Sequence, residues 1–465
     1  MLSKISTFVY AFIFMQFMAH AQYSKIFEFD YSITGAYPIH TTFITDGTWL
    51  FGVASNGGAN NDGVVFKIKP DGTGYAIIHE FNADVSGGAP KGSLYLLDDY
   101  LYGTTWANCD LGRGTLFRVK PDGSEFSTID GFDGDTTGQF PIGSLYYDGT
   151  YFYGMTTQGG ENLGGTVYRF LPAATSAIEA IFHFDLTVGF DPYSTFVSDG
   201  NYLYATTSEG GASNVGVVFK INFDGTGYTK LHEFTGTSPD GALPYGSLWY
   251  DGSEYLYGMS AAGGLNIAGM IYKVKTDGSG FETVYDFDGN TGKSPYGNLI
   301  LQGTTFYGLT TGSGPDIKGN MFSVEMDGSD YNQLVDFDGD NGSLPFGSLL
   351  YFDGAFFGMT AEGGINNDGV IFRYGDLTEG INEIKASALE IYPNPAENYV
   401  TISCPQSIDQ RMKIEFRNSV GEIVYTQKLN SGDQEINISF LPAGIYIVRS
   451  ESGENLYSNV LIVQH

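Results

Sequence analysis

Short runs of alternating apolar and polar residues, each ended by a turn signal, recur along most of the chain. The stretch GSLYYDGTYFYGMTTQGG at 143–160 returns as GSLWYDGSEYLYGMSAAGG at 246–264 and as GSLLYFDGAFFGMTAEGG at 347–364. The alternating run ends in Asp-Gly, which supplies the positive-φ positions of a tight hairpin turn. An aromatic run, a glycine-rich loop, a run such as GTVYRF and a run such as YAIIHEF follow. This pattern predicts four antiparallel strands per repeat.

Three markers keep one spacing and define the repeat. One is an aromatic residue followed by glycine, at Phe51, Tyr102, Tyr153, Tyr257, Tyr307 and Phe357, with Tyr204-Ala205 in the remaining slot. The others are a proline, at Pro38, Pro90, Pro141, Pro192, Pro244, Pro295 and Pro345, and a phenylalanine, at Phe29, Phe81, Phe132, Phe184, Phe234, Phe287 and Phe337. They mark seven units of about 51 residues, the period of a four-stranded propeller blade.

The glycine and the proline each have an expected role within the unit. Glycine inside a strand marks a bulge or lets a neighbouring backbone approach closely. Proline removes an N–H, and we expect it where the chain crosses from one unit to the next.

The two ends of the repeat region complement each other. The seventh unit stops after its third strand, at VIFRYGD, while the chain before the first unit begins with QYSKIFEFD, which has the pattern of a fourth strand. Pairing these two segments would leave no unpaired edge in the last unit. The sequence therefore predicts an all-β protein in which residues 22–375 form a seven-bladed β-propeller closed by its N-terminal strand. An open solenoid is the alternative.

The first 21 residues have the features of a secretory signal peptide. Lys4 precedes the apolar run TFVYAFIFMQFMA, and Ala19 and Ala21 form a small-x-small cleavage site ahead of Gln22. The run is too short to span a bilayer, which takes about 20 residues as a helix. We expect export and a mature chain that begins at Gln22; a buried N-terminal helix is the alternative.

Composition narrows the classes of partner. Aromatic residues make up 15% of the chain and charged residues 16%, with 65 glycines, as expected for strands and turns. The net charge of −31 opposes binding to nucleic acid or to an anionic membrane. Cys109 and Cys404 are too few for a disulfide framework and are predicted to be free structural thiols rather than a functional pair.

The repeat resembles a known family. With loops such as GGENLGGTVYRF, GGASNVGVVFKI and GGINNDGVIFRY, residues 22–375 resemble the GloVer tandem repeat of secreted bacterial proteins. Departures are Ala205, the segment LPAATSAIEA in place of an Asp-Gly turn, and WANCDLGRG without paired glycines. That family supplies no catalytic residues to carry over to this chain.

The C-terminal part resembles a second family. A polar linker at 376–387 precedes short alternating strands over 388–465. The motif Tyr392-Pro393-Asn394-Pro395, NSVGEIVYTQKL, and LPAGIYIVRS with Gly444 and Tyr446, look like the C-terminal sorting domain of type IX secretion cargo. The resemblance implies an Ig-like β-sandwich, the type IX machinery as partner, and delivery outside a Gram-negative cell before a surface protease removes the domain. An ordinary immunoglobulin-like binding module is the alternative.

One acidic stretch raises the question of calcium. Asp336, Asp338, Asp340 and Gly342 match the start of a calcium loop, and Asp286 and Asp288 begin a second copy. The twelfth position, Gly347 in one copy and Gly297 in the other, lacks the bidentate glutamate. We therefore expect turn and edge chemistry and no cofactor, and keep calcium as a weaker candidate.

No other residues form a catalytic signature that stands apart from the repeat. His79, His183 and His232 fall on equivalent fourth strands, where a repeat position explains them better than a metal centre does. The strand order places the crossings between units and the glycine-rich loops on one face. We expect a non-catalytic binding propeller with a glycan or protein ligand on that face. The alternative is a glycan-active hydrolase or lyase, which a non-repeating pair of acids at the channel mouth would favour.

Overall fold

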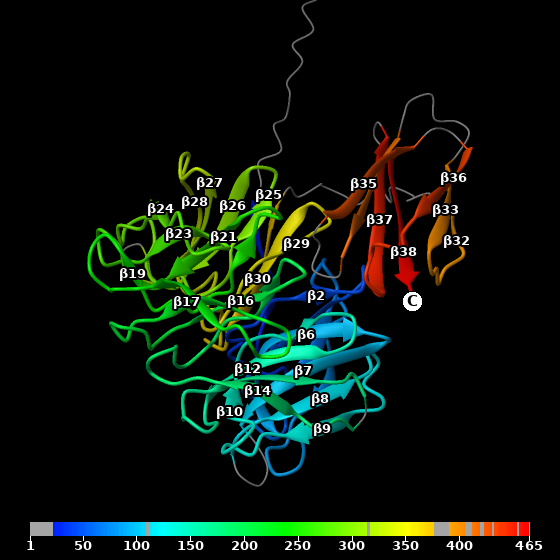
Figure 1. Ribbon diagram of the computed structural model, residues 1–465. Coiled ribbons are helices and arrows are strands. Elements are labelled where there is room, and N and C mark those ends of the chain that lie inside the picture. Colours follow the sequence, from blue (N-terminus) through cyan, green and yellow to red (C-terminus); the bar gives the residue numbers. More distant parts are fainter. Residues whose placement is uncertain are drawn as a thin grey trace, which may run out of the picture.

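The computed structural model describes residues 22–107, 112–173, 175–313, 317–375, 390–404, 412–418, 423–429, 432–452 and 455–464. These residues form strands and turns without any helix, and hence without a helix that could cross a membrane. The strands belong to antiparallel sheets, most of them four-stranded (Figure 1). The predicted all-β, propeller-like class is confirmed. The segments 1–21 and 376–387 and residue Cys109 lie outside the described residues.

The described strands between residues 22 and 375 form seven sheets of four or five strands, which we call repeat sheets 1 to 7, and one two-stranded sheet. Sheet 1 consists of β2 (Ile44–Thr45), β3 (Leu50–Ala54), β4 (Val64–Ile68) and β5 (Ala76–Glu80), and sheet 2 of β6 (Gly88–Leu97), β7 (Tyr100–Ala107), β8 (Thr115–Val119) and β9 (Ser127–Gly131). Sheet 3 consists of β10 (Gln139–Pro141), β11 (Tyr146–Tyr147), β12 (Phe152–Gln158), β13 (Thr166–Phe170) and β14 (Glu179–His183). Sheet 4 consists of β15 (Val197–Ser198), β16 (Leu203–Thr207), β17 (Val217–Ile221) and β18 (Thr229–Glu233).

Sheet 5 consists of β20 (Trp249–Tyr250), β21 (Tyr255–Ser260), β23 (Met270–Lys275) and β24 (Glu282–Asp286), and the same repeat contains the short pair β19 (Gly241–Ala242) and β22 (Ala262–Gly263). Sheet 6 consists of β25 (Ile300–Gln302), β26 (Thr305–Thr310), β27 (Asn320–Glu325) and β28 (Asn332–Asp336). Sheet 7 consists of β29 (Leu350–Phe352), β30 (Ala355–Thr360), β31 (Val370–Gly375) and β1 (Gln22–Glu28). Each repeat therefore supplies one sheet, as its sequence pattern predicts.

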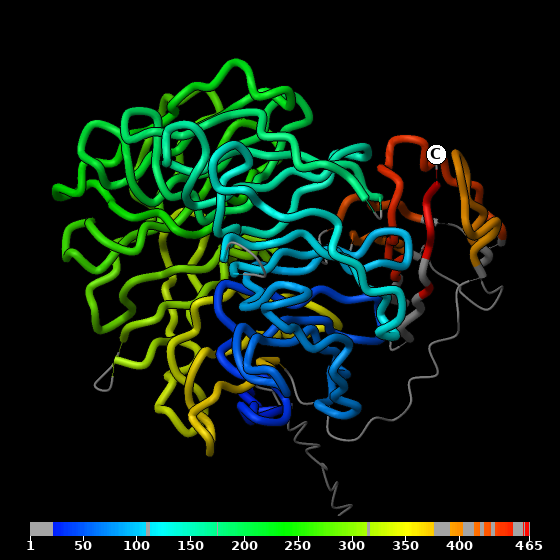
Figure 2. The backbone as a smooth tube through the Cα atoms, turned by 90° about the horizontal axis from the view of Figure 1, so that it is seen from below, coloured from blue at the N-terminus to red at the C-terminus, as the bar shows by residue number. Residues whose placement is uncertain are grey.

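The last sheet takes its fourth strand, β1, from a segment that precedes the first repeat in the sequence. β1 pairs antiparallel with β31, so that Tyr23 lies opposite Tyr374 and Glu28 opposite Val370. In Figure 2 the chain colours pass around from blue through cyan and green to yellow, and the blue and yellow segments lie side by side. The predicted pairing between the two ends of the repeat region is present.

The core lies between successive sheets and is largely aromatic. Tyr153, Met155 and Val167 of sheet 3, for example, pack with Phe196 and Phe219 of sheet 4. All five are nearly or fully excluded from solvent. Each such ring contributes about 2 kcal/mol or more of transfer free energy.

The glycine after each strand-2 aromatic has a different role from the one expected. Gly154 lies opposite Tyr168 of strand β13, and a Cβ on Gly154 would lie 2.3 Å from the Tyr168 hydroxyl. A Cβ on Gly358 would lie 2.4 Å from the ring of Phe372. The glycine thus makes room for an aromatic side chain on the neighbouring strand and not for a neighbouring backbone. The bulges lie instead between strands 3 and 4, as between Val65 and Phe66.

The crossings and the glycine-rich loops meet on one face, as predicted. The Ala89 N–H, at the end of one crossing, donates to the Asp62 carbonyl of the preceding glycine-rich loop at 2.7 Å. Phe140 and Arg113 make the same contact one repeat later, at 2.9 Å. We call this side of the repeats the crossing face.

The C-terminal part forms two further sheets around its own core. One sheet has the order β32 (Glu390–Tyr392), β33 (Tyr399–Cys404) and β36 (Gly432–Asn437), and the other β35 (Ile423–Leu429), β34 (Met412–Arg417), β37 (Gly444–Ser452) and β38 (Asn455–Val463). Val400, Ile414, Phe416 and Val448 are fully buried between them. Residues 390–464 thus form a small β-sandwich, in orange and red in Figure 1.

Candidate functional site at the axis of the repeats

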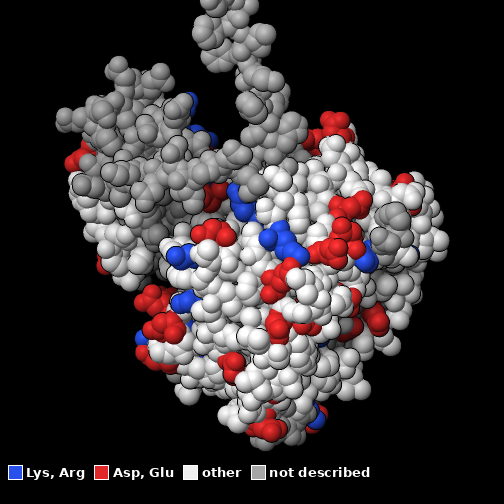
Figure 3. Space-filling view, turned by 180° about the vertical axis from the view of Figure 1, so that it is seen from behind, with Lys and Arg blue, Asp and Glu red and all other residues white. Residues whose placement is uncertain are grey.

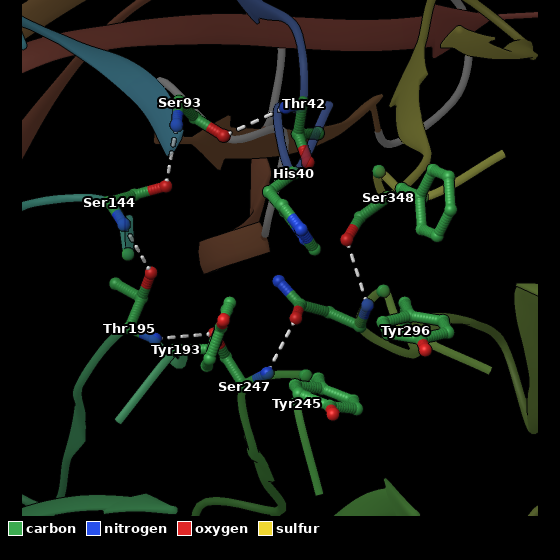
Figure 4. A pocket seen from close by; sticks show the side chains of 16 residues that line it. His40, Thr42, Ser93, Ser144, Tyr193, Thr195, Tyr245, Ser247, Tyr296 and Ser348 are labelled. Carbon is green, nitrogen blue, oxygen red and sulfur yellow. Dashed lines mark hydrogen bonds between the residues drawn. The ribbon is translucent and has the colours of Figure 1, made fainter. Parts of the chain in front are cut away.

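Equivalent residues from all seven repeats meet around one axis. Each occupies the serine position of a segment that begins with the marker proline and resembles Pro-x-Gly-Ser-Leu. Successive residues of this set are 50 to 52 positions apart in the sequence. They are Thr42, Ser93, Ser144, Thr195, Ser247, Asn298 and Ser348. The backbone N–H of each of the first six donates to the side-chain oxygen of the next, at 2.6 to 2.8 Å (Figure 4). We call this series the axial girdle.

The girdle surrounds a narrow polar cavity. Its volume is about 30 Å³. A single water needs about 10–15 Å³ measured in this way, so the cavity accommodates one or two waters and no sugar ring. A larger ligand would have to lie above the girdle, at the mouth of the cavity on the crossing face.

Aromatic side chains line part of that mouth. They are the residues that directly follow the proline in repeats 4 to 7: Tyr193, Tyr245, Tyr296 and Phe346. Successive ring centroids lie 5.0, 4.6 and 5.1 Å apart, in edge, stacked and edge arrangements. All four are only partly buried. We call these residues the aromatic arc.

His40 projects toward the arc from repeat 1, which adjoins repeat 7 (Figure 4). The first repeat has one extra residue between its proline and its girdle residue, and His40 lies in that insertion with φ of 56°. Its ring lies 5.7 Å from that of Tyr193 and 5.8 Å from that of Phe346. Burial, with a smaller effect of the Lys91 charge, lowers the pKa of His40 to about 4, so His40 is neutral at neutral pH.

One acid that does not recur in the other repeats, Asp191, lies near the arc. Asp191 directly precedes Pro192, where the other repeats have Tyr37, Ala89, Phe140, Leu243, Ser294 and Leu344. Its neighbour Phe190 exchanges two backbone hydrogen bonds with Glu209, at 2.9 and 3.0 Å. Asp191 Oδ1 is buried without a hydrogen-bond partner. Burial, and secondly the charge of Glu209, raise the pKa of Asp191 to about 7.

We expect Asp191→Asn to stabilise the protein at alkaline pH. An unfolded aspartate titrates near 3.8, against about 7 in the folded chain, so the folded chain binds more protons between these values. The wild type therefore loses stability as the pH rises from about 4 to 7, and asparagine does not. Allowing for partial exposure, Asp191→Asn should raise the free energy of unfolding by about 1–2 kcal/mol at pH 8 and by little at pH 5.

Thermal melts of both proteins at pH 5 and pH 8 measure this difference. Glu161→Gln, which removes an exposed acid from a glycine-rich loop, is the matched control. An Asp191→Asn gain of equal size at both pH values would contradict the titration.

The aspartates considered for calcium make contacts with their own loops or with neighbouring segments. Asp338 Oδ1 accepts from the Asn341 N–H at 2.9 Å, and Asn341 Nδ2 donates to the Asp336 carbonyl at 2.8 Å. Asp288 Oδ1 accepts from the Thr291 N–H at 2.7 Å, and Asp286 Oδ1 from the Leu265 N–H at 2.9 Å. Asp340 offers its backbone carbonyl to Lys25 at 2.9 Å.

These carboxylates do not converge on a common point. Across the described ranges, no group of three or more His, Cys, Asp or Glu residues could hold a metal ion. Gly297 and Gly347, at the twelfth positions, belong to the axial segments, and Gly342 lies at the end of the crossing loop with φ of 123°. The arrangement is that of turn chemistry.

The three histidines on fourth strands lie in separate sheets. His79 stacks on Phe126 at 3.6 Å, and His232 stacks on Phe281 at 3.5 Å. His183 Nδ1 accepts from the Glu161 N–H at 3.2 Å. None of them lines the axial cavity.

The residues predicted for sorting lie around the end of β38. Asn394 Oδ1 accepts from the Ile462 N–H at 2.8 Å, and Gly444 lies opposite Val463. The Tyr446 hydroxyl donates to the Pro442 carbonyl at 2.8 Å, and Tyr392 donates to Asp433 at 2.9 Å. Pro393 and Pro395 are exposed beside them. Of the predicted cleavage residues, Ala19 and Ala21 lie outside the described residues, and Gln22 begins β1.

The axial residues were not predicted from the sequence. The proline was interpreted as a marker of spacing and of the crossing between units, and the residues after it were not aligned. Such an alignment shows the Ser/Thr/Asn position, the aromatic residues of repeats 4 to 7, the insertion at His40 and the single acid at Asp191.

Comparisons with solved structures give remote likenesses, all below 0.5 in TM-score. The extracellular domain of a hybrid two-component system from B. thetaiotaomicron is 12% identical with a TM-score of 0.48, and the match covers 96% of this chain and 59% of that one. An oligogalacturonate lyase in complex with manganese is 15% identical, at 0.47, over 78% and 99%. An ulvan lyase is 10% identical, at 0.42, over 75% and 96%. This chain thus spans less than two thirds of the first of these proteins.

Comparison with family models is more informative, although no curated protein matches the chain. The model described as Gloeobacter/Verrucomicrobia repeat matches residues 46–255 and 237–388. The model described as Secretion system C-terminal sorting domain matches residues 390–464. That domain indicates delivery to the cell surface or the extracellular space and interaction with the type IX secretion machinery. Since the first model covers well over half of the sequence, the chain belongs to the Gloeobacter/Verrucomicrobia repeat family and ends in a type IX sorting domain.

Proposed function

We propose that the mature protein is a secreted, non-catalytic binding propeller that holds a glycan at the mouth of the axial cavity. The observation that carries this proposal is the aromatic arc of Tyr193, Tyr245, Tyr296 and Phe346. These rings are partly exposed, lie side by side and belong to four separate repeats. A row of fixed aromatic faces suits the apolar faces of successive sugar rings, because each contact buries apolar area with little loss of side-chain entropy.

The surroundings of the arc favour a neutral, hydroxyl-bearing ligand. The girdle below it consists of hydroxyl groups and one amide, and the neutral His40 ring lies beside it. A small number of polar groups placed around an apolar surface is typical of small-ligand sites. Lys and Arg are sparse and Asp and Glu common on the face shown in Figure 3, in keeping with the net charge of −31 and against an anionic polymer.

We expect the double substitution Tyr245→Ala and Tyr296→Ala to weaken glycan binding at least about tenfold, because each lost stacking contact is worth roughly 1 kcal/mol beyond its buried area. The measurement is a glycan-array screen of the mature chain, followed by titration calorimetry with the best ligand. Tyr31→Ala, an exposed tyrosine of a crossing outside the axial cavity, is the control. Equal losses in both variants would contradict an axial site.

A glycan-active enzyme is the second candidate, and the acidic pair of Asp191 and Glu209 favours it. Asp191 stands outside the repeat pattern, whereas Glu209 has an equivalent in Glu362 of repeat 7. The electrostatic influence of Asp191 and Glu209 raises the pKa values of Tyr193 and Tyr245, where burial is the main cause. A carboxyl with a pKa of about 7 is protonated often enough at neutral pH to donate a proton to a glycosidic oxygen, while its ionised partner serves as base or nucleophile.

Reducing-end assays on polysaccharide mixtures separate the two functions. An enzyme would release new ends, with a rate that falls above about pH 7 as Asp191 loses its proton, and Asp191→Asn would abolish the release. A binding protein would show no release and would retain affinity in Asp191→Asn.

We also infer that the seven repeat sheets are the blades of one closed seven-bladed propeller spanning residues 22–375. The axial girdle and the β1–β31 pairing support this inference. In the same proposal, cleavage after Ala21 releases the mature chain, which is then exported across the outer membrane of a Gram-negative cell. Residues 376–387 link the propeller to the sorting domain.

A further inference from the structure

Repeats 2 and 3 take no part in the aromatic arc, and a different set of side chains lies there on the crossing face. The Trp106 ring, near the end of β7, stacks on Phe140 of the next repeat, with their centroids 4.8 Å apart. The Lys91 ammonium lies 4.2 Å from the centre of the Trp106 ring. All three side chains are partly exposed. We call Lys91, Trp106 and Phe140 the Lys91 cluster.

The Lys91 cluster lies close to the mouth of the axial cavity. Lys91 directly follows Pro90, and this is the position that the aromatic arc occupies in repeats 4 to 7. Phe140 directly precedes Pro141, which begins the axial segment of repeat 3. The Lys91 charge also acts on the pKa of His40, which lines the cavity. A glycan that lies over the arc and the mouth can therefore reach the cluster as well.

Lys91 and Trp106 have no equivalent in the other repeats. None of the other residues that directly follow a marker proline is charged; they are Ile39, Ile142, Tyr193, Tyr245, Tyr296 and Phe346. The position of Trp106 is taken elsewhere by a small residue: Ser55, Thr157, Ser208, Ala261, Thr311 and Ala361. The small hydroxyl groups bond to the axial segments, as Thr157 does to the Phe140 carbonyl at 3.0 Å. Repeat 2 has instead a large, partly exposed ring beside a lysine, which indicates a local function and not the general packing of the repeats.

Lys91 has an aromatic neighbour but no oxygen partner. Within the described ranges, no oxygen accepts a hydrogen bond from its ammonium and no Asp or Glu forms an ion pair with it. By contrast, Lys67 beside Trp49 also donates to the Pro121 carbonyl at 2.9 Å. Burial lowers the pKa of Lys91, because the fold removes water from the ammonium and puts no oxygen in its place. A negative group of a ligand would supply that oxygen through a charge-assisted hydrogen bond.

We propose that the Lys91 cluster is an acidic-sugar subsite of the axial mouth, where Lys91 binds a carboxylate or sulfate carried by one unit of the glycan. The inference rests on the proposed glycan-binding function and adds a charge preference to it. The ligand is neutral over the aromatic arc and carries one negative group at Lys91. Trp106 acts as a positioning residue, because its ring holds the Lys91 ammonium and is itself stacked on Phe140. One lysine selects a single acidic unit and does not make this acidic protein a binder of anionic polymers.

The test is a ligand-observed NMR titration of the mature chain with methyl β-glucuronide, glucose 6-sulfate and the uncharged methyl β-glucoside. The wild type should bind the two charged sugars at least about tenfold more tightly than the glucoside, because charge-assisted hydrogen bonds are roughly twice as strong as neutral ones. Lys91→Met keeps an apolar side chain and removes the charge, so it should reduce the affinity for both charged sugars to that for the glucoside. Lys293→Met removes an exposed lysine of another crossing and is the matched control.

Trp106→Phe and Trp106→Leu test the positioning role. Phenylalanine retains an aromatic face for the ammonium and should keep most of the preference for the charged sugars, whereas leucine should lose most of it. Equal preference in the two variants would show that Trp106 does not position Lys91. Thermal melts of all four variants establish that they fold.

The proposed function and the subsite fail in different ways. If the glycan array gives no ligand for the wild type, the glycan-binding function is wrong, and the subsite falls with it. If the array gives a ligand but the wild type binds the three sugars equally, or binds none of them, the Lys91 subsite is wrong and the aromatic arc stands alone. A preference that is retained in Lys91→Met, or lost equally in Lys293→Met, would also overturn the subsite. A preference for only one of the charged sugars supports it and identifies the bound group as a carboxylate or a sulfate.

Discussion

Deleting residues 22–28 should lower the melting temperature of the mature protein by on the order of 10 °C. The deleted strand β1 touches three repeat sheets. It pairs with β31 of sheet 7 along its length, Phe27 stacks on Tyr75 beside sheet 1 at 4.2 Å, and Lys25 donates to the Asp340 carbonyl after sheet 6. Tyr23, Ile26 and Phe27 are partly buried, and each contributes roughly 1–2 kcal/mol. The loss also leaves β31 with an unpaired edge, which invites association with other chains.

Differential scanning calorimetry and light scattering measure the two effects of the deletion. A synthetic peptide of sequence QYSKIFEFD, added in excess, should restore part of the lost stability by occupying the vacant edge. The same peptide with Tyr23 and Phe27 replaced by serine is the control. An unchanged melting temperature and a monomeric deletion variant would show that β1 does not close the repeats.

Much of the fold follows from local patterns that the sequence repeats. Asp-Gly turns and alternating runs define four strands, and the structure forms them even where a copy departs from the pattern. β14 begins at Glu179, at the end of LPAATSAIEA, and Ala205 is fully buried in the slot of a glycine. The reason is that each sheet packs between two others, so that neighbouring units impose its geometry. The pairing of the two ends was predictable because a missing strand and a surplus strand have the same pattern.

The candidate site was not predictable in the same way, because it depends on contacts between residues about 50 positions apart. Asp191 is one of 53 acidic residues, and only an alignment of the seven repeats on their prolines separates it from the turn aspartates. Its distinction in the structure is that it lies near Glu209 and that its Oδ1 is buried without a hydrogen-bond partner. The role of the strand-2 glycines was misjudged for the same reason, since the ring of Tyr168 lies on another strand from Gly154.

The second large effect is expected from adding a methyl group to one of the glycines in the axial segments. A Cβ on Gly246 would lie 2.1 Å from the Gly297 carbonyl oxygen, and a Cβ on Gly297 would lie 2.2 Å from the Gly347 carbonyl oxygen. Both oxygens are backbone atoms of the next repeat, which the girdle hydrogen bonds hold in place. An added methyl group therefore cannot be accommodated by rotating a side chain, and successive repeats must move apart.

Gly246→Ala should destabilise the protein by about 3 kcal/mol and lower its melting temperature by roughly 5 °C. Gly131→Ala is the matched control, because a Cβ on Gly131 meets no atom within 4 Å and its φ is not positive. Ser194 fills the same slot in repeat 4, where its hydroxyl donates to the Thr206 carbonyl of its own repeat at 3.0 Å, so that copy accommodates a small polar side chain. If Gly246→Ala melted like Gly131→Ala, the repeats would not be in close contact at the axis, and the girdle could not be what fixes the mouth of the proposed site.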